Sequence, residues 1–232
     1  MEGTIAIIAA LPSELKPLAS GWQRVQAGKG TVLWERRYAR GRWIAGCSGM
    51  GGSRASLTLS EIEKHGAVDA ICSVGWAGSL DAGIGAGAAL RIAQVVDTQT
   101  GERFFAAQSN GEQQPLLATT AHVANAAEKA RLAVSYGARL VDMEAATLAR
   151  IARAREIPFY CFKAVSDGKD AELPDLNRFI MADGRLRMMP FLAHTVVRPA
   201  SWPGLIRLGR NSSLAARHLA QAIQQWLEAD TV

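Results

Sequence analysis

Three acidic residues stand at points where an apolar run of the chain ends, and acids in such places can bind hydroxyl groups or transfer protons. Glu144 lies in the segment LVDMEAA (residues 140–146), where an apolar strand is expected to turn into a helix. Asp167 ends the segment AVSD (residues 164–167), which closes the next apolar strand, and Glu14 follows the first strand of the chain. In such a set, one carboxylate can accept hydrogen bonds from hydroxyl groups while another donates a proton.

The segments that precede these acids predict buried strands. Residues 4–10 and 159–165 are largely apolar without alternation, which is typical of strands covered on both faces in a parallel sheet. Sheets of this kind bind ligands beyond the carboxyl ends of their strands. We therefore expect the acids to project into one ligand-binding region. Pro12 suits the first turn of the helix expected next to Glu14.

The rest of the chain alternates between strand and helix patterns. Further strands are expected at 31–38, 42–47, 69–74, 88–97 and 116–120, the first two forming a hairpin, and helices at 54–65, 126–134, 144–156 and 211–228. Residues 104–115 are polar and are expected to form a loose surface loop. The alternation and the length of 232 residues predict a single α/β domain that spans residues 1–232.

Two glycine-rich stretches, residues 49–52 and 75–78, are expected to form turns at strand ends and to free backbone N–H groups. The first opens a helix, whose dipole favours an anion or a ribose oxygen. Glycine in such turns also has a plainer explanation, namely backbone geometry alone. Arg54, one turn into the helix, either adds a positive charge to an anion pocket or is a solvated side chain.

Composition narrows the classes of function. Apolar residues make up 49% of the chain and charged residues 20%, as in a globular domain. The net charge of +5 comes from scattered Lys and Arg without interleaved aromatic residues. This favours a solvated basic face over a nucleic-acid surface, although the positive field can attract an anionic substrate.

The cysteines and the apolar runs indicate a reduced, non-membrane location. Cys47, Cys72 and Cys161 lie in apolar runs, and their spacing fits neither a zinc site nor a disulfide framework. We expect them to be buried. No stretch has the length of a transmembrane helix or the pattern of a signal peptide, so a cytoplasmic protein is expected.

Each acid has a purely structural explanation. Acids are common near helix N-termini because the helix dipole stabilises them, which would account for Glu144 and Glu14. Asp167 stands between Ser166 and Gly168, where it could cap a turn. Three acids at three strand ends of one sheet nevertheless favour a shared site.

Five segments in order resemble the purine nucleoside phosphorylase superfamily. The segments VDMEAA (141–146) and AVSD (164–167) are similar to its signature pair, and the methylthioadenosine/S-adenosylhomocysteine nucleosidase branch is the closer match. The segments IIAALPSE (7–14), SGMG (48–51) and GWAGSL (75–80) agree in order and spacing. The resemblance covers roughly residues 4–180. It implies a three-layer fold, with a mixed central sheet flanked by helices.

The resemblance also implies the chemistry, which is cleavage of an N-glycosidic bond in an adenosine-type nucleoside with a modified 5′ position. Asp167 matches the acid that protonates the purine so that adenine can leave. Glu144 matches the carboxylate that binds ribose hydroxyls, Met143 a residue that packs on the sugar, and Glu14 the carboxylate that positions water. No metal or other cofactor is implied.

Further positions are expected to line the site by the same resemblance. Base-binding residues are expected to be Ser166, Ala77, Gly78 and His122, and the 5′-group or anion pocket is expected to contain Met50, Trp76 and Arg54. For His122 an exposed surface side chain is the competing explanation. The implied partners are a small purine nucleoside and a water or phosphate co-substrate, with no nucleic acid, and the chain is expected to form a homo-oligomer, a dimer or higher.

Hydrolysis is favoured over phosphorolysis. The phosphorolytic branches usually carry a Gly/Pro/Arg loop after the first strand, whereas this chain has LPSE (11–14), without arginine. Trp76 replaces a small residue that often carries a hydroxyl in relatives. Arg54 with the turn at 51–53 could still rebuild an anion pocket, so phosphorolysis remains the alternative.

Residues 185–210 are expected to be an insertion rich in apolar groups with interspersed arginines. It would pack as an extra helix, or cover a nucleoside with a large apolar 5′ substituent. Hopanoid-associated relatives remove adenine from adenosylhopane, which makes an adenosylated lipid the matching alternative substrate. A third possibility is a non-catalytic nucleoside-binding protein, made conceivable by Trp76 and the short segment between Asp97 and Thr119.

Overall fold

The computed structural model describes residues 3–38, 41–107, 115–171, 176–179, 181 and 202–229. Its centre is a mixed sheet in which the strands follow the order β2-β3-β4-β1-β5-β10-β9-β7-β8, and β11 pairs with both β5 and β6. The strands are β1 Gly3–Ala9, β2 Gln23–Val25, β3 Val32–Tyr38, β4 Gly41–Cys47, β5 Ala70–Ser79, β6 Ala89–Arg91, β7 Gln94–Asp97, β8 Arg103–Phe105, β9 Leu116–Thr119, β10 Leu140–Asp142 and β11 Phe159–Asp167.

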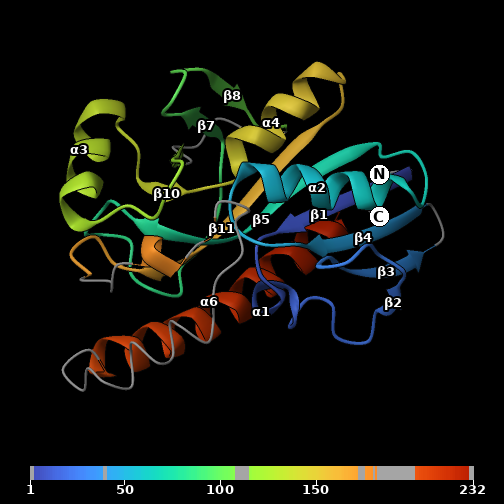
Figure 1. The fold of residues 1–232 in the computed structure, drawn as a ribbon, viewed down its shortest axis with the longest axis horizontal. Helices are drawn as coiled ribbons and strands as arrows, with labels where there is room; N and C mark the ends of the chain where they lie inside the picture. Colours follow the sequence, from blue (N-terminus) through green and yellow to red (C-terminus); the bar gives the residue numbers. More distant parts are fainter. Residues whose placement is uncertain are drawn as a thin grey trace.

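Helices cover both faces of the sheet (Figure 1). They are α1 Pro12–Leu15, α2 Gly52–Glu63, α3 Ala126–Tyr136, α4 Ala145–Ala154 and α6 Trp202–Ala229, with a short 3₁₀ turn, η1, at Leu176–Phe179. The three-layer α/β fold with a mixed sheet is therefore confirmed. None of the described helices combines the length and apolarity needed to cross a bilayer.

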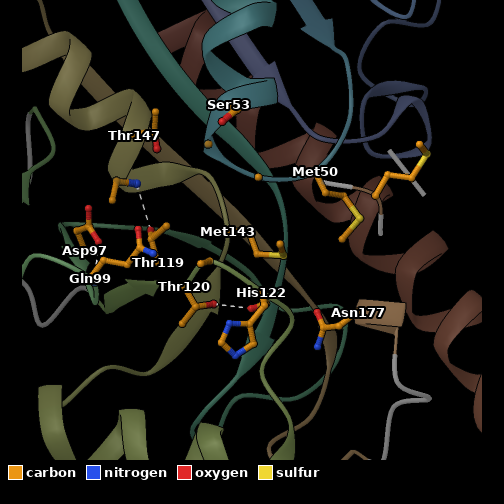
Figure 2. Close-up of a pocket in the computed structure, with 15 residues that line it drawn as sticks. Met50, Ser53, Asp97, Gln99, Thr119, Thr120, His122, Met143, Thr147 and Asn177 are labelled. Carbon is orange, nitrogen blue, oxygen red and sulfur yellow. Dashed lines mark hydrogen bonds between the residues drawn. The ribbon is translucent and has the colours of Figure 1, made fainter. Parts of the chain in front are cut away.

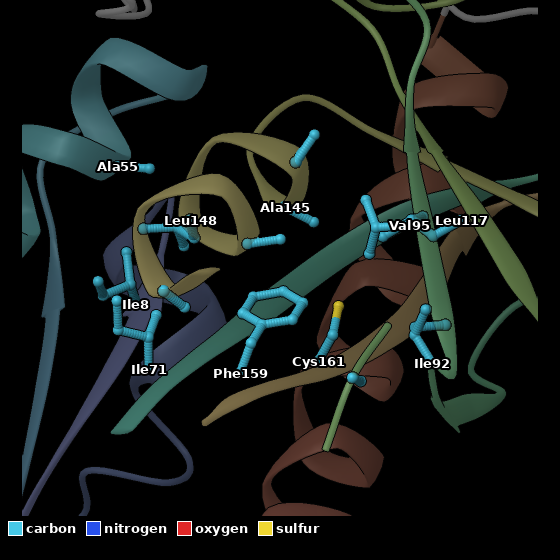
Figure 3. Packing of buried hydrophobic residues seen from close by; sticks show 14 of the residues in the cluster. Ile8, Ala55, Ile71, Ile92, Val95, Leu117, Ala145, Leu148, Phe159 and Cys161 are labelled. Carbon is cyan, nitrogen blue, oxygen red and sulfur yellow. The ribbon is translucent and has the colours of Figure 1, made fainter. Parts of the chain in front are cut away.

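Strand β1 explains the layers, because its side chains alternate between two cores. Ala6 and Ile8 belong to the core under α2 and α4, and Figure 3 shows Ile8 beside Leu148 of α4. Ile5 and Ile7 belong to the opposite core. There the Trp226 ring of α6 lies 4.6 Å and 5.2 Å, centroid to centroid, from the rings of two β11 residues, Tyr160 and Phe162. The predicted burial of strand 159–165 on both faces is confirmed.

Two strand predictions were wrong in extent. Residues 75–78 were expected to form a turn, but they belong to β5, which pairs with β11 over this stretch and with β10 at Gly78 and Ser79. Pairing on both edges outweighs the local preference of glycine for turns. Residues 88–97 form two strands, because β6 pairs with β11 while β7 pairs with β8 and β9.

The terminal helix begins earlier than the predicted residue 211. It runs without interruption from Trp202 to Ala229, so the end of the expected 185–210 insertion is the first part of α6. Pro203 stands in the first turn, where its missing N–H is tolerated. Residues 185–201 of the expected insertion lie outside the described residues. The hairpin β3–β4, the helices near 54–65, 126–134 and 144–156, and the buried cysteines are as predicted.

Candidate active site

The three predicted acids share one cavity of about 200 Å³, here called the acid-lined cavity. Glu14 reaches it from α1, Glu144 from the N-terminus of α4, and Asp167 from the end of β11. The cavity is further lined by Ala10, Leu11, Met50, Trp76, Ala77, Gly78, Thr120, His122, Val123, Ala124, Lys129, Val141, Asp142, Met143, Ser166, Leu208 and Ser212. Acids far apart in the sequence therefore meet beyond the strand ends.

Glu14 is held in place by backbone donors. Its side chain is buried, and Oε2 accepts hydrogen bonds from the N–H groups of Ala10 (2.9 Å) and Leu11 (2.6 Å). Oε1 accepts one from the N–H of Trp76 at 2.7 Å. Burial raises the pKa of Glu14, while these N–H groups and the charge of Lys163 act in the opposite direction. The carboxylate is thus fixed at the cavity wall with little freedom to turn.

Gly75 makes this arrangement possible. Its φ is +137°, and a Cβ at this position would lie 2.7 Å from Oε1 of Glu14. Any other residue would push against the carboxylate and adopt a backbone angle that L-residues rarely take. The predicted role of residues 75–78 as a free turn was wrong, but the N–H of Trp76 does serve a carboxylate.

Glu144 connects two helix N-termini. Its Oε1 accepts a hydrogen bond from the N–H of Gly51 at 2.6 Å, immediately before α2, while Glu144 is itself the N-cap of α4. Burial, together with the nearby charge of Asp142, raises the pKa of Glu144 to about 7. The expected free N–H at residues 49–52 therefore binds a carboxylate of this chain.

A buried ion pair lies behind Glu144. Nζ of Lys163 lies 2.8 Å from Oδ2 of Asp142, and Oδ1 of Asp142 accepts a 2.7 Å hydrogen bond from the hydroxyl of Thr119. Burial alone would lower the pKa of Lys163, but Asp142 and Glu144 raise it above its usual value. The ammonium also lowers the pKa of Glu14 and of Glu144. The positive charge of Lys163 therefore acts on three carboxylates, those of Asp142, Glu14 and Glu144.

A β-bulge aims Asp167. Val165 pairs with Ala77 and Asp167 with Gly78, so Ser166 is an extra residue in β11. Because side chains alternate along a strand, the bulge turns Asp167 away from the face that buries Val165. The hydroxyl of Ser166 donates a 2.7 Å hydrogen bond to Oδ1 of Asp167.

Lys129 is a site residue that sequence reasoning missed. It comes from α3, is 1% exposed, and its Nζ forms an ion pair with Oδ2 of Asp167. The same Nζ donates to the carbonyl oxygen of Gly168 at 2.8 Å. In the sequence this lysine stands in an ordinary helical segment with polar neighbours, and nothing there signals burial.

A second cavity of about 470 Å³ adjoins the first, and the two share Met50, Thr120, His122 and Met143. Figure 2 shows the residues that line this neighbouring cavity, with Met50, Met143 and His122 coming from three different segments. Asn177 of η1 closes it by exchanging two hydrogen bonds with the backbone of Val123, at 2.9 Å and 3.0 Å.

The other predicted positions fall into two groups. Ala77, Gly78, Ser166, Met143, Met50, Trp76 and His122 all line the acid-lined cavity. The ring of His122 is largely exposed and lies 2.9 Å from Oε2 of Glu128. Arg54 is buried in α2 and lines neither cavity. The structure therefore does not bring Arg54 to the acids.

Within the described part of the chain, no three His, Cys, Asp or Glu side chains are grouped so that they could hold a metal ion. The chemistry available from the described lining residues is that of carboxylates, one ammonium group, the imidazole of His122, hydroxyl groups, backbone N–H groups and apolar surface. Such a set can protonate a leaving group, bind hydroxyls and orient a small nucleophile.

Comparison with known proteins identifies the family and agrees with the fold. The family model of the phosphorylase superfamily matches residues 4–127 and 112–196. The sequence has no significant match among the curated proteins. Among solved structures, the chain is similar to 5′-methylthioadenosine nucleosidase of Arabidopsis thaliana, with a TM-score of 0.75 and 18% identity, over 98% of this chain and 95% of that one.

Two further solved structures have the same fold. Futalosine hydrolase of Helicobacter pylori matches with a TM-score of 0.73 and 16% identity, over 98% of each chain. S-adenosylhomocysteine nucleosidase of Streptococcus pyogenes, in complex with 5-methylthiotubericidin, matches with a TM-score of 0.73 and 19% identity, over 98% of this chain and 97% of that one. At these identities the likeness concerns the fold.

Proposed function

Since this chain belongs to the phosphorylase superfamily, whose enzymes cleave N-glycosidic bonds, we propose that it hydrolyses an adenosine-type nucleoside with a modified 5′ position and releases adenine. The observation that carries the proposal is the meeting of Glu14, Glu144 and Asp167 in one cavity of about 200 Å³. The solved structures named above are nucleosidases and a hydrolase, which supports the same reaction type.

The roles follow from position and from the resemblance of the motifs. Asp167 faces the base and delivers the proton that makes the purine a neutral leaving group. Glu144 accepts hydrogen bonds from the ribose hydroxyls, and Met143 packs against the sugar. Glu14 orients water and takes up its proton. Because the sugar becomes cationic as the bond breaks, these carboxylates also stabilise the transition state.

Hydrolysis is supported over phosphorolysis by the charges around the cavity. Phosphate binds best to arginine, lysine or free backbone N–H groups. Among the described residues that line the two cavities there is no arginine, and Lys129 already pairs with Asp167. The N–H of Gly51 donates to Glu144. A carboxylate in the position of Glu14 repels phosphate and suits water.

The side of the acid-lined cavity that α6 contributes supports a substrate with an apolar 5′ substituent. Leu208 of α6 lines the acid-lined cavity together with Leu11, Met50 and Trp76. This wall favours an alkyl or alkylthio group, and a larger apolar chain such as that of an adenosylated lipid is the second candidate. Residue 208 falls in the segment expected to be an insertion. Of the two alternatives for that segment, an extra packed helix or a cover over the substrate, this proposal adopts contact with the substrate.

The direct test measures base release with and without phosphate. The purified protein is incubated with methylthioadenosine, adenosylhomocysteine or 5′-deoxyadenosine, and both the base and the sugar product are quantified by chromatography. We expect adenine and a free reducing sugar without phosphate. If only a sugar 1-phosphate forms, and only with phosphate, then the hydrolytic proposal is wrong. Tight nucleoside binding without turnover in either buffer would instead identify a binding protein.

The variant Glu14→Gln tests the assigned role of water activation. We expect it to lose hydrolysis by about 10²–10⁴-fold while it still binds nucleoside. Its matched control is Glu61→Gln, because Glu61 is also buried and also accepts a backbone hydrogen bond, from Gly28, but lies outside both cavities. Equal losses in the two variants would argue against a specific role for Glu14.

A further inference from the structure

Lys129 occupies an unusual position for a lysine. Its side chain is 1% exposed, lines the acid-lined cavity and points to the acid that faces the base in the proposed function. A buried ammonium needs strong partners, and it has Oδ2 of Asp167 and the carbonyl oxygen of Gly168. An ammonium group has three protons to donate. Two are directed to these partners, which leaves one for a ligand or water in the cavity.

Gly78 on β5 leaves space for the ion pair of Lys129 and Asp167. A Cβ on Gly78 would lie 3.0 Å from Cε of Lys129, 3.2 Å from its Nζ and 3.1 Å from Oδ2 of Asp167. The lysine and the carboxylate therefore pack directly over the backbone of β5. This close fit fixes the pair at the point where the base is expected to lie.

Each carboxylate oxygen of Asp167 lies within hydrogen-bond distance of a side-chain donor. Oδ1 of Asp167 accepts from the hydroxyl of Ser166, and Oδ2 accepts from Lys129, so both oxygens act as acceptors. A carboxylate with two acceptor oxygens has no proton to give to a leaving group. Of the two side-chain donors to Asp167, the hydroxyl of Ser166 and the ammonium of Lys129, only the ammonium is positively charged and suited to give a proton to a carboxylate. To act as a general acid, Asp167 must receive such a proton and present it to the purine base.

We propose that Lys129 is a positioning residue that supplies through Asp167 the proton transferred to the purine. The inference rests on the proposed function. An N–H bond of Lys129 breaks as an O–H bond forms on Asp167, and that proton then passes to a ring nitrogen of the purine. The electron pair of the glycosidic bond goes to the base. Water adds to the sugar and gives its proton to Glu14. Glu14 then releases this proton to solvent and solvent returns one proton to the neutral amine, which closes the cycle.

Two physical descriptions of the pair predict opposite results when the ammonium is removed. If Asp167 alone were the acid, then loss of the neighbouring positive charge would favour its protonated form and leave catalysis intact or faster. If Lys129 supplies the proton, then Lys129→Met leaves Asp167 dependent on protons from solvent. In that case kcat falls by about 10²–10⁴-fold near neutral pH, and the residual kcat rises as the pH is lowered.

The conservative variant separates proton supply from electrostatic positioning. A guanidinium group keeps the positive charge but does not release a proton at accessible pH. We therefore expect Lys129→Arg to remain as inactive as Lys129→Met, whereas a lysine that only orients Asp167 would be replaced by arginine with recovery of kcat. Arg131→Met is the matched control, because it removes an exposed charge from the same helix.

The experiment measures kcat and KM of the full-length protein for methylthioadenosine from pH 5 to pH 9, together with thermal unfolding of each variant. The proposal is supported by a kcat loss with little change in KM, a residual rate that rises toward low pH, and no recovery in Lys129→Arg. It is overturned if Lys129→Met keeps kcat within threefold of the parent, if arginine restores kcat, or if the loss is independent of pH.

Folding and function are separated by two further measurements. If Lys129→Met does not fold, then Lys129→Gln replaces it, because the amide still donates a hydrogen bond and carries no transferable proton. The same three outcomes apply to this variant. The parent protein separates the two proposals: if it releases no base from any nucleoside, the proposed function fails, whereas base release with fully active Lys129 variants refutes only the role of Lys129.

Discussion

Lys163 and Asp142 form an ion pair in which Nζ and Oδ2 lie 2.8 Å apart, and neither side chain is more than 1% exposed. The pair joins β11 to β10 beneath the acid-lined cavity. Asp142 also accepts hydrogen bonds from the hydroxyl of Thr119 and the N–H of Ala145, so its carboxylate is fully engaged. The pair therefore affects both the stability of the sheet and the pKa values of Glu14 and Glu144 in the cavity above it.

The first prediction concerns Lys163→Met. Removal of the ammonium leaves the carboxylate of Asp142 buried without a counter-charge, which typically costs about 3–5 kcal/mol. The pKa values of Glu14 and Glu144 are also expected to rise, because Lys163 lowers both. We expect a large decrease in the free energy of unfolding at pH 7, measured with denaturant.

Lys64→Met is the matched control for that substitution. Lys64 also pairs with an acid, Glu61, but its side chain is 65% exposed. Exposed pairs contribute about 0–1 kcal/mol. Comparable losses in the two variants would show that the buried pair has no special importance for stability.

The second prediction is a pH dependence caused by Glu144. Its pKa rises from 4.5 to about 7 on folding, so the folded protein binds a proton that the unfolded chain has lost between these values. The stabilising effect of this proton is complete below pH 4.5 and is lost as the pH rises through 7. Relative to Glu144→Gln, the parent should lose up to about 3 kcal/mol of unfolding free energy between pH 4.5 and 8. Parallel curves for the two proteins would contradict this assignment.

The sequence predicted the meeting of Glu14 and Asp167 because β1 and β11, the strands before them, both run parallel to β5. Apolar runs such as residues 159–165 predict buried strands, and acids after such strands gather at one edge of the sheet. Glu144 follows β10, which pairs antiparallel with β5, so the same rule does not account for its position. The resemblance of the motifs then assigned roles to the acids. The sequence also indicated an ion pair at Lys163, because a charged residue within a strand buried on both faces requires a partner. This indication was not used to predict the pair.

The remaining features depend on tertiary structure. Lys129 is paired with Asp167, which follows a bulge at Ser166, and a one-residue shift of pairing leaves no trace in the local sequence. Residues 75–78 looked like a turn because glycine is usual there, yet two neighbouring strands hold them in β5. The early start of α6 was missed because Asn211 resembled a helix cap.

The third prediction is that Gly75→Ala disrupts the site by displacing the side chain of Glu14. The new Cβ would lie 2.7 Å from Oε1 of Glu14 at a φ of +137°, so the carboxylate must move away from the N–H of Trp76. Such backbone strain costs about 1–3 kcal/mol. Activity is expected to fall further than stability, since Glu14 is displaced. Gly85→Ala is the control, because its Cβ would meet no atom within 4 Å. A fully active Gly75→Ala protein would contradict the proposed position of Glu14 during the reaction.

The fourth prediction concerns Asp167→Asn, for which the proposed role of Asp167 predicts loss of base release, and a nearly isosteric substitution would by itself leave the fold intact. The ion pair with Lys129 changes the expectation for the fold. The variant leaves the buried ammonium of Lys129 without its counter-charge, which typically lowers the free energy of unfolding by about 3–5 kcal/mol. We therefore expect loss of both activity and unfolding free energy. The double variant Asp167→Asn with Lys129→Met removes the unpaired charge and should regain stability without activity. A double-mutant cycle in unfolding free energy measures this coupling, and additive effects of the two substitutions would show that the two side chains do not interact.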